Sequence, residues 1–230
     1  MNSLDWLWTL AVPPLAWLGL RWFERANLYF PKRQMDSDPG LIGLGFEDLR
    51  LAAEDGTALH AWFVPLEADS PVILFCHGNG GNISFRLDKL LRLRQAGASV
   101  LLFDYRGYGR SAGRPSEQGT YQDAQAAYRW LTETRGLPAR RIVIHGESLG
   151  GAVAMELAGR CPSAGLILES TFTSVIELGR QIFPFLPLNM MIRFRYDTLS
   201  KISRLDRPLL VMHSPEDDMI PYGMGQKLFA

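Results

Sequence analysis

The chain has 230 residues, and its 47% hydrophobic content is enough for one α/β domain with a large core behind an N-terminal extension. Lys and Arg number 24, as do Asp and Glu, and this net charge of zero supplies no basic surface for nucleic acid, which we do not expect as a partner. Cys76 and Cys161 lie far apart in the sequence. We therefore predict no disulfide framework, no metal site and no cofactor.

The N-terminal residues 1–31 contain a long apolar stretch. No charge falls between Trp6 and Leu20, and residues 6–23 would form a helix about 27 Å long, enough to cross a membrane. We predict a single membrane anchor; a helix lying in the membrane interface and a helix packed on the domain are the alternatives. A cleaved signal peptide fits less well, because Asp5 stands where a basic residue is expected and no small-x-small site follows.

Basic residues follow the apolar stretch at Arg21, Arg25, Lys32 and Arg33. The positive-inside rule then places the following domain on the cytoplasmic side of the membrane. Residues 32–45 are rich in Pro, Gly and Asp and are predicted to be a linker, so the folded domain is predicted to span residues 46–230.

The domain opens with two alternating segments, 46–53 and 58–66, separated by Asp55-Gly56. This pattern predicts an antiparallel β-hairpin. Short apolar runs then alternate with helical segments, which predicts a doubly wound, mostly parallel sheet whose site lies at the carboxyl ends of the strands. The predicted strands are 72–76, 100–103, 142–144, 166–168 and 209–212, and the predicted helices are 84–95, 120–135 and 149–159.

A G-x-S-x-G pattern, Gly146-Glu147-Ser148-Leu149-Gly150, lies between one of these strands and the helix that follows it. A strand that turns directly into a helix forces its central residue into a strained conformation, and side chains two positions either side would collide. Gly146 and Gly150 avoid that collision. The Ser148 hydroxyl is then expected to project beside a helix N-terminus, which favours developing negative charge.

Four further segments accompany this pattern: FCHGNGGN at 75–82, FDYRGYGRSAG at 103–113, LESTFTS at 168–174 and HSPEDDMIP at 213–221. Together they resemble the α/β-hydrolase superfamily, in particular its small membrane-anchored branch of serine aminopeptidase-like and acyl-thioesterase-like members. The resemblance covers about residues 42–230 and implies the α/β-hydrolase fold with a short helical cap.

The resemblance implies a role for the loop at 77–81. It places an oxyanion-hole donor at the Asn79 N–H, with the Leu149 N–H as the second donor. His77 resembles the loop-shaping histidine of the family motif rather than a base, and Gly78 lets the backbone approach the substrate. An ordinary tight turn is the alternative for this loop. Asp104, Arg106 and Arg110 are expected to hold loops together.

The resemblance also implies a triad acid. Aligning His213 and Pro221 on the family pattern places the acid at Asp217, although Ser214 replaces the usual glycine. Asp218 is the nearest rival and Glu216 a poorer one. Glu169, at the end of the preceding strand, is a further alternative, because some superfamily members keep their acid there.

The family's triad order is Ser, acid, His, and no histidine follows Asp217 in this sequence. The tail at 223–230 reads as the start of a helix, so we expect the last strand and the histidine loop to be missing and the chain to be a fragment of a longer product. A natural loss of the base is the alternative. In either case the chain as given is predicted to be nearly inactive.

The segment 171–203 is predicted to form a small apolar cap. Its apolar side chains are expected to pack the cap on the domain, and the alternative is that they suit a small or lipid-like acyl substrate or a membrane surface. The functional prediction is a serine hydrolase that cleaves an ester, thioester or amide through an acyl-enzyme on Ser148. The alternative, from a different class, is an inactive membrane-tethered scaffold with the same fold. The intact G-x-S-x-G segment favours the first, and the absent histidine favours the second.

Overall fold

The computed structural model describes the backbone of residues 5–230 and the side chains of residues 17–230. Seven strands form one sheet in the order β2-β3-β6-β4-β7-β8-β9. Their bounds are β2 Glu47–Ala52, β3 Ala58–Val64, β4 Val72–Cys76, β6 Ser99–Phe103, β7 Ile142–Glu147, β8 Gly165–Glu169 and β9 Leu209–Met212. The two-residue strands β1 Phe30–Pro31 and β5 Gly80–Gly81 form a separate small sheet.

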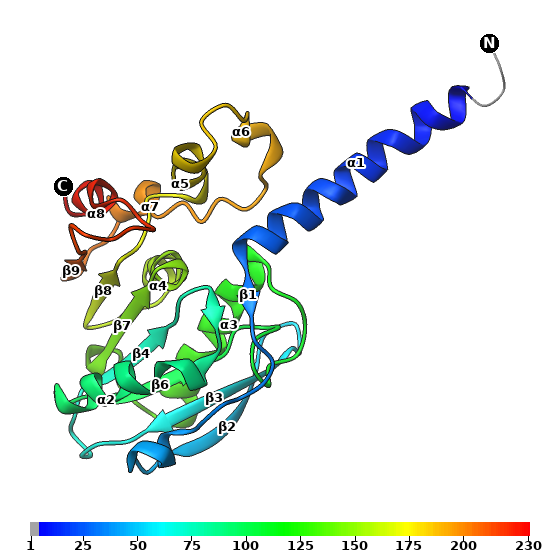
Figure 1. The fold of residues 1–230 in the computed structure, drawn as a ribbon. Coiled ribbons are helices and arrows are strands. Elements are labelled where there is room, and N and C mark those ends of the chain that lie inside the picture. Colours follow the sequence, from blue (N-terminus) through cyan, green and yellow to red (C-terminus); the bar gives the residue numbers. More distant parts are fainter. Residues whose placement is uncertain (1–4) are drawn as a thin grey trace.

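Helices cover the sheet and its carboxyl edge (Figure 1). The α-helices are α1 Asp5–Leu28, α2 Leu87–Gln95, α3 Glu117–Arg129, α4 Leu149–Arg160, α5 Val175–Ile182, α6 Leu188–Met191, α7 Leu199–Ile202 and α8 Tyr222–Phe229. The 3-10 turns are η1 Pro39–Ile42, η2 Ile83–Arg86 and η4 Ala139–Arg141, and the π-helical turn η3 Trp130–Thr134 extends α3.

The strand pairing confirms the predicted fold. β2 and β3 are an antiparallel hairpin around Asp55-Gly56, and β3 pairs antiparallel with β6. The pairs β4·β6, β4·β7, β7·β8 and β8·β9 are all parallel. The chain is therefore a mostly parallel, doubly wound α/β sheet with an N-terminal antiparallel hairpin.

Residues of the central strands alternate between two cores, because successive side chains point to opposite faces of a sheet. On β4, Ile73 and Phe75 pack toward α2, whereas Leu74 and Cys76 pack toward α3 and α4. Both faces of these strands are thus covered, which explains their unbroken apolar sequence.

The sheet order also locates the site. β4 lies between β6 and β7, so the chain leaves β4 toward one side of the sheet and later returns to add β7 on the other. The loops that follow β4 and β7 diverge at this point, and ligands of open α/β sheets bind in such a crevice.

The predicted membrane-spanning anchor is not supported. Residues 1–4 of the predicted anchor, 1–31, lie outside the described residues. Of the remainder α1 covers Asp5–Leu28, and no described helix is both long enough and apolar enough to cross a membrane. The last two turns of α1 carry the charged residues Arg21, Glu24 and Arg25. The buried Glu24 carboxylate pairs with Arg21 at 2.7 Å and accepts a hydrogen bond from the Arg193 N–H at 2.6 Å.

Candidate active site

Ser148 sits on the sharp turn between β7 and α4. Its backbone has φ 55° and ψ −120°, a region that a residue with a side chain rarely adopts. The Ser148 N–H donates to the Glu169 carbonyl at 2.9 Å, and the Ser148 carbonyl accepts from the Thr171 hydroxyl at 2.7 Å. The strain is therefore held in place by the neighbouring strand β8.

Close packing of the backbone explains why the turn has glycine at positions 146 and 150. A Cβ at Gly146 would lie 2.2 Å from the Gly150 carbonyl oxygen, and a Cβ at Gly150 would lie 2.0 Å from the Cys76 carbonyl oxygen. Both distances are far below van der Waals contact, and backbone atoms cannot move aside cheaply. The first turn of α4 thus packs directly on the end of β4, and this brings Ser148 to the loop that follows β4.

The loop after β4 lies against the nucleophile. A Cβ at Gly78 would be 3.4 Å from the Ser148 Cβ, and Gly78, Asn79 and Ser148 line the same open cleft. Within the described residues the Asn79 N–H has no hydrogen-bond acceptor. Leu149 is the first residue of α4, so its N–H belongs to the turn that has no intrahelical acceptor. The structure therefore brings together Ser148 and both amides that the sequence selected.

The cleft wall is largely apolar near Ser148. Phe30 from β1, Phe85 from η2 and Met219 from the loop before α8 line it, with exposed fractions of 54%, 45% and 74%. Single exposed apolar side chains are ordinary, but three in one cleft give it an apolar part that suits an apolar ligand, beside the charged lining residues Lys32, Arg86 and Glu147. No sequence pattern connects Phe30 with the site, because Phe30 stands almost 120 residues before Ser148.

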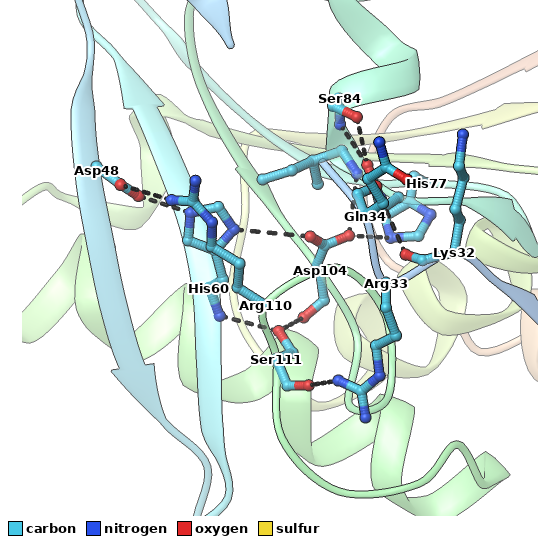
Figure 2. A network of polar contacts seen from close by, with 12 residues as sticks. Lys32, Arg33, Gln34, Asp48, His60, His77, Ser84, Asp104, Arg110 and Ser111 are labelled. Atoms are coloured by element: carbon cyan, nitrogen blue, oxygen red, sulfur yellow. Dashed lines mark hydrogen bonds and ion pairs between the residues drawn. The ribbon is translucent and has the colours of Figure 1, made fainter. Parts of the chain in front are cut away.

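His77 lies beneath the loop rather than in the cleft. It is fully buried, its Nδ1–H donates to the Gly78 carbonyl at 2.7 Å, and its ring packs on Tyr105 at 4.5 Å. Burial lowers the pKa of His77 to about 3, so the ring is neutral at physiological pH. Figure 2 shows the buried Asp104 between His60 and His77. Through these contacts His77 stabilises the loop at 77–81 from below.

Asp104 supports the same loop. Its Oδ1 accepts the Ile83 N–H at 2.9 Å and lies 3.6 Å from the His77 Nε2. Burial raises the pKa of this carboxyl. Arg106 lies further from the cleft, where it pairs with Asp123 at 2.8 Å, and Arg110 pairs with Asp48 at 3.3 Å.

Asp217 lies in the loop between β9 and α8, which also carries the cleft residue Met219. Its Oδ1 accepts the N–H groups of Met219 at 3.0 Å and Ile220 at 2.8 Å. Partial burial by itself would raise the pKa of Asp217, but these two hydrogen bonds lower it. The rivals Asp218 and Glu216 are exposed.

Glu169 is engaged elsewhere. Its side chain accepts from His145 Nε2 at 2.9 Å and pairs with Lys89, which also lies 3.4 Å from Glu147. Burial by itself would raise the pKa of Glu169, but the hydrogen bonds from His145 and Lys89 lower it to about 2. The carboxylate is thus an ion-pair partner that ties α2 to the end of β8.

The four histidines all lie in the described part of the chain, and none is among the residues that line the Ser148 cleft. His60 bonds Asp48 at 2.6 Å, and His213 donates from Nε2 to the Ile220 carbonyl at 2.8 Å. His213 also lies 3.6 Å from the Asp217 carboxylate. Each histidine of this sequence therefore has a structural partner away from the nucleophile.

Comparisons with known proteins agree with this geometry. The model of the Alpha/beta hydrolase family matches residues 73–222. The uncharacterized protein Rv2307c of Mycobacterium tuberculosis is 39% identical over 210 residues, which cover 90% of this chain and 74% of that protein. The alpha/beta hydrolase domain-containing protein WAV2 of Arabidopsis thaliana is 37% identical over 231 residues, covering 90% and 75%.

Among solved structures, the esterase Pf2001 of Pyrococcus furiosus superposes with a TM-score of 0.71 at 19% identity, over 88% of this chain and 82% of the esterase. A puromycin-hydrolyzing peptidase of Mycobacterium tuberculosis gives a TM-score of 0.65 at 20% identity, over 81% and 33%. At these identities the two structures share the fold. With the family match and the relatives above, they place the chain in the alpha/beta hydrolase family.

Proposed function

We propose that this protein is a serine hydrolase that cleaves an acyl ester, thioester or amide through an acyl-enzyme on Ser148. The observation that carries the proposal is the strained Ser148 backbone, φ 55°, at the start of α4, facing the loop that holds Asn79. Strain of this kind persists where function requires it, and an ordinary strand-to-helix turn has no need for it.

In the proposed reaction the Ser148 oxygen attacks the acyl carbonyl while a base takes the hydroxyl proton. The N–H groups of Asn79 and Leu149 stabilise the oxyanion. The base returns the proton to the leaving group, and water then hydrolyses the acyl-enzyme. Asp217 is the proposed acid that orients the base. The base is the histidine that the family order places after the acid, and this sequence has none there.

The apolar cleft wall supports a substrate with an apolar acyl group next to the reacting carbonyl. Phe30, Phe85 and Met219 offer exposed apolar surface for such a group. A chain-length series of p-nitrophenyl acyl esters tests this point, and the rise of kcat/KM with each methylene measures the apolar contact.

The test of the whole proposal is labelling by a fluorophosphonate probe, applied to the protein expressed from its complete gene. An activated serine reacts with the probe, so the wild type is expected to label and Ser148→Ala is expected not to. Ser163→Ala, at the surface between α4 and β8, is the matched control and keeps full labelling. A folded wild-type protein that does not label contradicts the proposal and favours a non-catalytic scaffold.

A further inference from the structure

The loop that holds Asn79 is fixed by hydrogen bonds from other segments, and one of them runs from the Tyr108 hydroxyl to the Asn79 carbonyl at 2.8 Å. β5 consists of Gly80 and Gly81 alone, and its strand partner is β1, which lies about 50 residues earlier in the sequence. The Phe30 N–H donates to the Asn79 carbonyl and the Lys32 N–H donates to the Gly81 carbonyl, both at 3.0 Å. Two carbonyls of the loop are therefore held by the segment that follows α1.

The register of the β1·β5 pairing explains why a proline is tolerated at position 31. Pro31 lies between the two donors and has no N–H, and it stands where an N–H would point away from β5. In the sequence Phe-Pro-Lys at 30–32, the first and third residues therefore donate their N–H groups to the loop, and the proline leaves no unpaired N–H on the outer edge of β1.

Side-chain hydrogen bonds join the same two segments. The Asn79 Nδ2 donates to the Leu28 carbonyl at 3.0 Å. The buried Asn82 side chain donates to the carbonyls of Lys32 at 2.9 Å and Gln34 at 2.6 Å. Its Oδ1 accepts the Ser84 N–H at 2.9 Å, so this one amide caps η2 and also binds the N-terminal segment. Figure 2 shows Lys32, Gln34 and Ser84, the three residues that the Asn82 side chain joins.

The N-terminal segment is itself fixed to the domain. Tyr29 is buried, and its hydroxyl bonds the Tyr196 hydroxyl at 2.8 Å, which in turn bonds the Thr120 hydroxyl of α3 at 2.9 Å. Because side chains alternate along an extended chain, Tyr29 faces the core and Phe30 faces the cleft. The N-terminal segment thus contacts the core through Tyr29 and the 79–82 loop through Phe30.

We propose that residues 28–34 are a positioning segment for the oxyanion hole: they hold the 79–82 loop at the distance from Ser148 that catalysis needs. The inference rests on the proposed function. An oxyanion donor acts only when it is preorganised within a fraction of an ångström, so loss of the segment lowers the rate rather than substrate binding.

The sharpest test is Asn82→Asp in the protein expressed from its complete gene. The variant keeps the Oδ1 acceptor for Ser84 but turns the two donors toward Lys32 and Gln34 into an acceptor facing two carbonyls. We expect kcat to fall about 10-fold or more with KM within about twofold. Affinity for an alkylboronic acid, which forms a tetrahedral adduct on the serine, falls in parallel, whereas a loss of stability alone lowers neither quantity per folded molecule.

The matched control is Asn27→Asp. Asn27 makes an amide hydrogen bond of the same kind to the Phe23 carbonyl on the exposed face of α1 at 2.8 Å, away from the loop. It is expected to keep kcat and boronate affinity within about twofold of wild type. An Asn82→Asp protein that also stays within twofold, with a normal melting temperature, overturns the proposal.

Two deletions give a second, coarser measurement. Removal of residues 1–27 leaves the segment in place, and removal of residues 1–37 takes it away. We expect kcat to differ between them by about 10-fold or more, and amide hydrogen exchange at 79–84 to be faster only in the shorter protein. Equal exchange in both overturns the proposal. If wild type does not label with the fluorophosphonate, the proposed function fails, and the exchange experiment still decides whether the segment holds the loop.

Discussion

The turn that carries Ser148 and the loop that carries Asn79 lie against each other, yet they are built differently. Residues 146–150 carry nearly everything that shapes the turn: a serine at φ 55° and two glycines whose Cβ atoms would collide with backbone. The loop at 77–82 instead receives hydrogen bonds from distant segments: from β1, from the Tyr105 hydroxyl to the His77 carbonyl and from the Tyr108 hydroxyl to the Asn79 carbonyl. The turn is local in sequence and the loop is assembled from segments far apart. A motif therefore reveals the first more readily than the second.

Asp217→Asn, in the loop between β9 and α8, has the largest expected effect on turnover. The amide oxygen still accepts from Met219 and Ile220, so the fold is kept, but the charge that stabilises the protonated base is lost. We expect kcat to fall about 10⁴-fold, measured with a p-nitrophenyl ester on the protein from its complete gene. Asp218→Asn, at an exposed position, serves as control. Equal losses in the two variants would move the acid away from Asp217.

The local turn is tested by Gly150→Ala. Its Cβ would lie 2.0 Å from the Cys76 carbonyl oxygen, so α4 must shift away from β4. We expect a loss of about 3–5 kcal/mol in the free energy of unfolding, measured by urea denaturation. Fluorophosphonate labelling of Ser148 falls with it.

Gly159→Ala in the same helix is the matched control, because a Cβ there meets nothing within 4 Å. It is expected to raise the free energy of unfolding by about 0.5–1 kcal/mol, the usual gain of alanine over glycine in a helix. A similar loss in both variants would contradict the packing explanation, because only a Cβ at position 150 collides with backbone.

The smallest effect concerns Glu169, which joins the turn to α2. Its pKa in the folded protein is lowered from 4.5 to about 2, so its ion pairs stabilise the fold above pH 4.5 and are lost as the pH falls toward 2. The side chain is 22% exposed, and solvent screening leaves about 1–2 kcal/mol. Urea denaturation of wild type and Glu169→Gln at several pH values should show a difference above pH 4.5 that closes below it. A difference independent of pH would contradict the ion-pair explanation.

The first helix shows the limit of a composition argument. Its apolar run predicts a helix, and α1 forms, but no described helix meets the length and hydropathy of a membrane span. The end of α1 instead buries Glu24, whose carboxylate holds Arg21 and the Arg193 N–H. The hydropathy of a segment does not reveal where its charged residues find partners.

The sequence by itself determined the fold class and the hairpin, because both follow from local periodicity and turn chemistry. It also selected Ser148, Asn79, Leu149 and Asp217 as candidates, through motifs that lie within short segments. Only the tertiary structure decided that residues 28–34 hydrogen-bond the loop at 79–82, that Phe30 lines the cleft and that Glu169 is tied to Lys89 and His145. These are hydrogen bonds and contacts between distant segments, and no local pattern of side chains encodes which backbone carbonyl will need a donor.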